Sequence, residues 1–179
     1  MSVTTRKSSQ ASPNSNQIHN AKTKTLMREK IVQMYDVLLR GDDPTSSSFG
    51  QPFWSEFFLL KPKISHFEAE LHKLNPEQLM AARVNLNTLF EQSLCNLSSD
   101  HHIRVVYALQ TLCGLLKCAF KKQSTSGVDL VNLLMGFEMA EKRMACLINH
   151  INHFLMDGDE PASLKDLCLK LLLIIGESF

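Results

Sequence analysis

The chain has 179 residues, with 19 Lys and Arg against 18 Asp and Glu, and a formal net charge of +1. This balance argues against a dedicated nucleic-acid-binding protein, which concentrates basic residues on one face. The composition, 44% hydrophobic and 21% charged, is typical of a globular protein rather than a disordered one. No uninterrupted apolar run approaches the roughly 20 residues that span a bilayer, so no transmembrane span is predicted.

Residues 1–23 predict a disordered basic tail. They are rich in Ser, Thr and Asn, and Val3 and Ile18 are their only sizeable aliphatic residues, so they bury too little surface to offset the entropy of ordering. No acid precedes Glu29. Two alternatives to a solvated tail remain open: a mitochondrial transit peptide, although the apolar helical face is lacking, and an electrostatic tether to anionic lipid or RNA.

Residues 24–179 predict an all-α domain, because apolar residues recur every three to four positions and no segment alternates like a strand. The periodicity predicts helices over residues 24–39, 52–60, 64–74, 76–97, 103–121, 128–136, 138–156 and 164–176. Gly41 is predicted to follow the first helix in a left-handed conformation. Asn75 is predicted to cap the fourth helix, with Pro76 in its first turn, and Ser163 is predicted to cap the last.

The segment 103–121 indicates how the helices pack. Its polar side is a narrow stripe formed by Gln110, Gly114, Lys117 and Lys121, so the helix must be covered on both flanks. The segment 164–176 is almost as apolar. Two such helices, joined to their neighbours by short connections, favour stacked layers over a four-helix bundle. We therefore predict an armadillo-like or HEAT-like helical solenoid.

The last helix looks incompletely covered. A solenoid normally ends in a repeat with a polar outer face, whereas residues 164–175 contain few charges. We expect the chain to be a fragment, a truncated form or an incomplete gene product. The alternative is a chain that covers this face by dimerising.

No catalytic motif of the P-loop, GxGxxG, GxSxG or HExxH type occurs, so no enzymatic activity is predicted. His150 and His153 are three residues apart on one helix and could contact one metal ion. They lack a nearby cluster of further ligands, which favours surface histidines. A small helical metal-binding or enzymatic protein remains the alternative. No catalytic, cofactor or metal residue is assigned.

Three other features are interpreted as core. The five cysteines include no CxxC pair and read as buried thiols of a reducing compartment. LxxLL strings begin at Leu112, Leu130 and Leu169; such strings can dock in grooves of partners, but a leucine-rich chain produces them by composition. The aromatic residues between Phe53 and Phe58 are expected to be buried rather than to anchor a partner or a membrane.

These segments together resemble the armadillo-like helical domain-containing protein 3 family of eukaryotes. The matching stretches are residues 30–36, 53–59, 103–113, 124–137 and 163–173. The likeness extends over about residues 24–175, and the block 103–137 is its most specific part.

The resemblance implies a non-catalytic armadillo-like solenoid in a cytosolic protein that associates with Golgi membranes and supports Golgi maintenance and secretion. It implies two partners, phosphatidylinositol 4-kinase beta and a Golgi guanine-nucleotide exchange factor for Arf GTPases. Members of the family are several hundred residues long, with their characteristic domain towards the C-terminus, so the chain corresponds to an N-terminal portion. For that reason no partner-binding residue is assigned.

Overall fold

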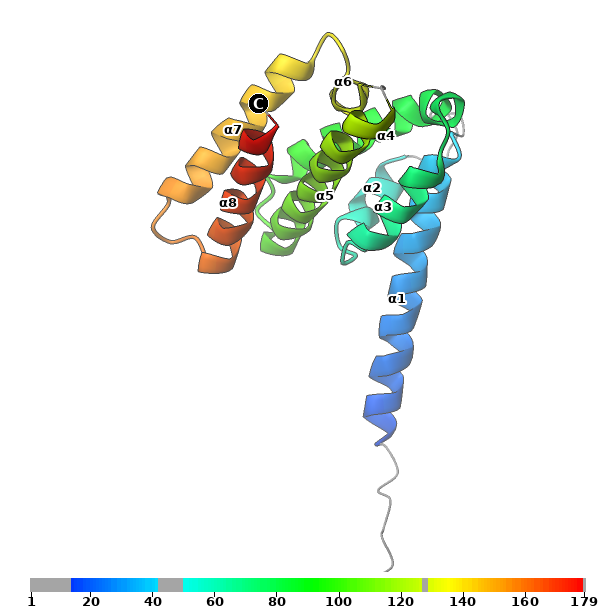
Figure 1. Cartoon of the computed structure of the whole chain (residues 1–179). Coiled ribbons are helices and arrows are strands. Elements are labelled where there is room, and N and C mark those ends of the chain that lie inside the picture. Colours follow the sequence, from blue (N-terminus) through cyan, green and yellow to red (C-terminus); the bar gives the residue numbers. More distant parts are fainter. Residues whose placement is uncertain (1–13, 42–49, 127–128, 179) are drawn as a thin grey trace, which may run out of the picture.

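The structure, a computed structural model, describes residues 14–41, 50–126 and 129–178. Within these ranges the chain is helical and contains no strand (Figure 1). The helices are α1 (Ser15–Leu39), α2 (Gln51–Phe57), α3 (Ile64–Lys73), α4 (Pro76–Asn96), α5 (His102–Ser126), α6 (Leu130–Met135), α7 (Ala140–Met156) and α8 (Ala162–Glu177). The all-α prediction is confirmed, and the arrangement is consistent with an armadillo-like helical domain.

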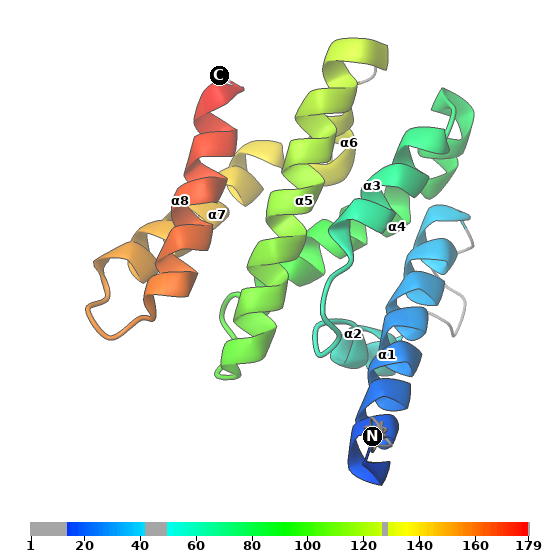
Figure 2. The ribbon, with the colours of Figure 1, turned by 60° about the horizontal axis from the view of Figure 1, so that its bottom comes forward.

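The helices form two layers. Helices α1, α3, α5 and α8 lie side by side in one layer, and α4, α6 and α7 pack behind them (Figure 2). Helix α5 contacts α3 and α8 within its layer and α4 and α6 behind it, which confirms that both of its flanks are covered. Leu109, Leu112 and Leu116 are completely buried there.

Helix α5 meets the length and composition criterion for a membrane span over His102–Lys121, with a mean hydropathy of 1.4. More than half of this segment, 56%, is buried inside the protein. Its apolar side chains pack against four neighbouring helices. A buried core helix meets the same criterion, so the hydropathy of α5 is accounted for by its central place in the fold.

Helix α1 begins at Ser15, nine residues before the predicted start. The predicted disordered tail is therefore wrong for residues 15–23, and residues 1–13 lie outside the described ranges. The N-terminal half of α1 projects from the body (Figure 1) and is almost entirely exposed. The buried residues of α1 begin at Ile31. Once the buried C-terminal half of α1 is anchored, each residue added towards the N-terminus contributes one hydrogen bond without a new nucleation cost.

The aromatic cluster lies between α1, α2 and α3. Trp54, Phe57 and Phe58 are buried, which confirms the prediction for these three, and Phe53 is half-buried. The ring centroid of Tyr35 on α1 lies 5.8 Å from that of Phe57 and 5.0 Å from that of Phe67 on α3. Edge-on and tilted contacts at these separations are favourable for aromatic pairs, and they join the first three helices.

Two predicted helix ends are confirmed. The Asn75 side chain accepts a hydrogen bond from the Gln78 backbone N–H at 2.8 Å, and the Gln78 side chain accepts one from the Asn75 N–H at 3.0 Å. This reciprocal pair is a capping box, which satisfies N–H groups left unpaired at a helix start. Gly41 follows α1 with a φ of 73°, in the left-handed region that glycine favours.

Other boundaries differ from the prediction. Helix α2 ends at Phe57 rather than Leu60. Helix α5 continues to Ser126, through most of the break predicted over residues 124–127. Helix α8 begins one residue before Ser163, and Pro161 occupies the N-cap position. In each case packing and neighbouring turns override a local signal of only one or two residues.

Asn85 lies on α4, and its side chain is buried, with 3% exposed. Its Nδ2 donates a hydrogen bond to the Leu38 carbonyl at 3.2 Å. The last carbonyls of a helix have no donor within the helix, and Leu38 lies in the final turn of α1. Asn85 therefore caps α1 from a distance of 47 residues in the sequence.

Candidate protein-binding surfaces

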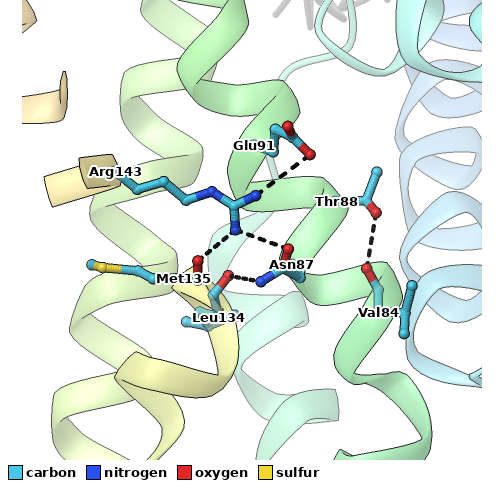
Figure 3. Close-up of polar contacts among 7 residues, drawn as sticks. All are labelled: Val84, Asn87, Thr88, Glu91, Leu134, Met135 and Arg143. Carbon is cyan, nitrogen blue, oxygen red and sulfur yellow. Dashed lines mark hydrogen bonds and ion pairs between the residues drawn. The ribbon is translucent and has the colours of Figure 1, made fainter. Parts of the chain in front are cut away.

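A polar cluster joins α4, α6 and α7 (Figure 3). Arg143 Nη1 on α7 donates to Asn87 Oδ1 on α4 at 2.8 Å and also to the Met135 carbonyl at the end of α6. Asn87 Nδ2 donates to the Leu134 carbonyl at 3.2 Å. Glu91 Oε2 lies 3.6 Å from Arg143 Nη2. The cluster supplies donors to the last carbonyls of α6 and contains no nucleophile, so its role is structural.

Gly136 allows this cluster to form. It follows α6 with a φ of 78°, which side chains rarely tolerate. A Cβ atom at this position would lie 2.9 Å from Asn87 Nδ2 and 3.4 Å from Arg143 Nη1. The absence of a side chain thus lets the turn between α6 and α7 sit directly against the Arg143 contacts.

The two candidate metal ligands lie on α7. His150 is half-buried and His153 is exposed, and both rings pack near Phe154. Burial, with a smaller contribution from His153, lowers the pKa of His150. Within the described ranges, no group of three or more His, Cys, Asp or Glu residues is placed to hold a metal ion. The structure therefore brings no further ligand to this pair.

The cysteines divide into two classes. Cys113, Cys118 and Cys168 are buried or half-buried, but Cys95 and Cys146 are exposed, so the prediction of five buried thiols is wrong for these two. All five are free. Burial raises the pKa of the Cys113 thiol to about 12 and that of Cys168 to about 11, which keeps both in the unreactive protonated form.

The LxxLL strings also divide. The strings beginning at Leu112 and Leu130 are buried, as predicted. The third is not core: Leu169 and Leu173 on α8 are 55% and 63% exposed. Helix α8 uses its opposite side to contact α5 and α7, so its outer face carries apolar side chains into solvent.

Two recesses lie at the α6 end of the molecule. A cavity of about 550 Å³ is lined by apolar side chains of α5, α6 and α7, with Asp129 and Glu141 as its charged residues. A smaller one of about 260 Å³ lies between α4 and α6, where Met80, Val84 and Phe137 are exposed. Exposed apolar surfaces of this kind are typical of protein–protein interaction sites.

A third recess, of about 390 Å³, lies between α3, α5 and α8. The polar stripe of α5 forms its floor, through Gln110, Gly114 and Lys117, and α3 and α8 form its walls. We call this recess the α3–α5–α8 groove. It is lined by Pro62, Ile64, Gln110, Cys113, Gly114, Lys117, Leu167, Lys170 and Ile174.

Comparison with curated proteins identifies relatives of this amino-acid sequence. The chain is 44% identical over 154 residues to armadillo-like helical domain-containing protein 3 of Xenopus laevis, and 43% identical over 155 residues to the Homo sapiens protein. The Danio rerio protein is 41% identical over 154 residues. Each match covers 86% of this chain. This chain is a homologue of these three proteins over that range. The resemblance stated from sequence segments is thereby confirmed.

The chain spans 22% of the length of these armadillo-like helical domain-containing protein 3 relatives. No family model matches it, and no solved structure matches it. The likeness therefore supports an armadillo-like helical domain.

Sequence reasoning assigned no binding surface to this armadillo-like helical domain-containing protein 3 homologue. One signal was present: the narrow stripe on α5, which contains a glycine and lysines within an otherwise apolar helix, marks the floor of the α3–α5–α8 groove. The walls could not be inferred, because Ile64 and Ile174 are 110 residues apart in the sequence and only the packing of α3 and α8 on α5 brings them together.

Proposed function

We propose that this chain is part of a non-catalytic scaffold in the cytosol that associates with Golgi membranes and supports Golgi maintenance and secretion. Its proposed partners are phosphatidylinositol 4-kinase beta and a Golgi exchange factor for Arf GTPases, which the scaffold recruits or regulates. The observation that carries the proposal is the 41–44% identity to armadillo-like helical domain-containing protein 3 over 86% of the chain.

The surface chemistry supports a scaffold rather than a catalyst. The polar cluster around Arg143 bonds helix ends to one another, and the buried thiols have raised pKa values. Each recess is lined by apolar side chains together with polar or charged ones. Stacked helices with apolar grooves are suited to holding segments of other proteins.

The test is capture and localisation in cells. The fluorescently tagged chain is expressed beside a variant with Leu109→Asp, which places a charge at a completely buried position and unfolds the domain. We expect the native chain to concentrate at the Golgi and to retain the kinase and the exchange factor in affinity capture, and the Leu109→Asp variant to do neither.

A native chain that stays diffuse and captures neither protein would contradict the proposal for this segment. That result would instead favour a truncated helical fragment with no autonomous function. The same cells test whether residues 1–23 are an electrostatic tether. If they are, their deletion abolishes localisation, and if they are not, localisation is unchanged.

A further inference from the structure

The α3–α5–α8 groove has a fixed shape. Helices α3 and α8 both pack on α5 (Figure 2), and Gly114 lets Ile64 of α3 approach the α5 backbone closely. On the other side, the Cys113 thiol lies 3.9 Å from the Leu167 carbonyl of α8. Apart from Pro62, which precedes α3, the lining residues of the groove therefore lie on three packed helices.

The groove combines apolar walls with two basic residues. Lys117 and Lys170 are its charged lining residues, and no acid lines it among the described residues. Both lysines are exposed, and neither makes an ion pair within the described ranges. Glu68 of α3 is engaged elsewhere, at 3.4 Å from Lys121 and 3.6 Å from His72. The cavity lined by α5, α6 and α7 has the opposite character, with Asp129 and Glu141 as its charged residues.

The walls restrict the secondary structure of an occupant. All three walls are helices, whose main-chain groups are bonded within the helix, so the groove offers no row of backbone donors and acceptors. An extended peptide would leave its own backbone groups unpaired against apolar side chains, which is costly. An α-helix satisfies its backbone internally. Gln110 and Lys117 lie about 10 Å apart along α5, or about two turns, which matches apolar positions i, i+4 and i+7 of an incoming helix.

We propose that the α3–α5–α8 groove binds one amphipathic α-helix of a partner protein, with its apolar side chains against Ile64, Leu167 and Ile174 and with acidic side chains beside Lys117 and Lys170. The inference rests on the proposed scaffold function and names the surface and the chemistry of the segment that it holds. Charge complementarity selects an acidic helix over a basic one. A recess with helical walls on two sides fits a helix better than the flat surface of a bilayer.

The test uses the purified full chain and a library of random helix-forming peptides displayed on phage. Peptides that bind are synthesised, and their affinities are measured by fluorescence anisotropy. We expect the selected peptides to be enriched in Asp and Glu flanking an apolar i, i+4, i+7 pattern, and to lose affinity as ionic strength rises. Hydrogen exchange should show protection in α3, α5 and α8.

The decisive variant carries Lys117→Glu and Lys170→Glu. Both side chains are exposed, so the fold should be retained, as circular dichroism will check. Reversing two attractive pairs should weaken binding by about tenfold or more. The matched control carries Lys24→Glu and Lys142→Glu, two exposed lysines on α1 and α7, and should bind the peptides with unchanged affinity.

Several outcomes would overturn the assignment: recovery of no helical peptide, selection without acidic enrichment, equal affinity of the Lys117→Glu/Lys170→Glu variant, or protection outside the three helices. Binding of anionic vesicles through these lysines without peptide binding would assign the surface to a membrane instead. Self-association through the groove, seen in sedimentation, would assign it to a second copy. If the kinase is still captured in cells while the groove test fails, the scaffold proposal stands and the groove assignment falls.

Discussion

Arg143 shows how one side chain fixes three helices. Its side chain, on α7, is only 12% exposed, and its guanidinium reaches Asn87 on α4 and the Met135 carbonyl on α6. A planar group with several donors can serve both acceptors at once. Because α6 has only six residues, its position depends on such contacts more than on its own hydrogen bonds.

We expect Arg143→Ala to lower the free energy of unfolding by about 1–3 kcal/mol, because it leaves partly buried acceptors without a donor. Arg143→Lys should lie between the wild type and the alanine variant, since an ammonium cannot reproduce the fork. Urea unfolding followed by circular dichroism measures both. Lys142→Ala, an exposed neighbour, is the control and should change stability little; equal effects of the Arg143 and Lys142 variants would exclude the structural role.

Because of Tyr35, we expect the free energy of unfolding to depend on pH in the alkaline range. Its hydroxyl accepts a hydrogen bond from the Lys63 backbone N–H at 2.9 Å, and burial raises its pKa from 10.0 to about 12. Between these values the unfolded chain releases the phenol proton while the folded chain keeps it. Stability from this group is therefore complete below about pH 10 and is lost as pH rises towards 12.

The variant Tyr35→Phe removes this titration. Its stability should fall less steeply than that of the wild type between about pH 10 and 12, although it loses about 1 kcal/mol at neutral pH because the Lys63 N–H has no acceptor. Unfolding free energies from urea titrations over a pH series measure the difference. Below the ordinary pKa of tyrosine the gap between the two proteins should be constant, and parallel curves above it would contradict the assignment.

At the scale of elements, the close approach of α3 to α5 depends on one position. A Cβ atom on Gly114 would lie 2.5 Å from Cγ2 and 2.8 Å from Cδ1 of Ile64. The side chain of isoleucine is branched at Cβ and cannot rotate freely away. A glycine in the middle of α5 lowers helix propensity, and here that cost is offset by the packing of α3.

We expect Gly114→Ala to destabilise the protein by about 1–3 kcal/mol through overpacking. Gly176→Ala is the matched control: this glycine is also helical, and a Cβ atom there meets nothing within 4 Å, so it should stabilise by up to about 1 kcal/mol. The double variant Gly114→Ala/Ile64→Ala should lose less free energy of unfolding than the sum of the losses in the two single variants. Thermal unfolding is measured for the wild type, the three single variants and the double variant, and strict additivity would show that the two residues do not meet.

At the scale of the whole molecule, the two-layer packing decides which thiols meet solvent. Cys95 on α4 and Cys146 on α7 are exposed, whereas the thiols on α5 and α8, those of Cys113, Cys118 and Cys168, are buried or half-buried. Burial, with a smaller effect of Glu91, also raises the pKa of Cys95, so exposure rather than acidity makes it accessible.

We expect the native protein to react quickly at two of its five thiols with an aromatic disulfide reagent, and at the remaining three only on unfolding. The variant Cys95→Ser/Cys146→Ser should have no fast phase. Absorbance of the released thiolate gives the count, with and without denaturant. A third fast thiol in the native protein would mean that the core around α5 and α8 opens in solution.

Features that depend on neighbours in the sequence were predictable. The apolar period identified every helix of the described ranges, the Asn75 capping box involves residues three apart, and Gly41 ends α1 as its position indicated. These contacts form within one or two turns, so the residues that make them are visible together in the sequence. The central place of α5 also followed, because a helix that is apolar on most sides must be surrounded.

Tertiary structure alone decided the rest. Asn85 is buried because it meets the end of α1, 47 residues away. Leu169 and Leu173 are exposed because α8 packs through its opposite side, and the α3–α5–α8 groove exists because two distant helices flank one stripe of α5. A helical period fixes which residues share a face, but only the packing of one helix on another determines which apolar face is covered and which remains available to a partner.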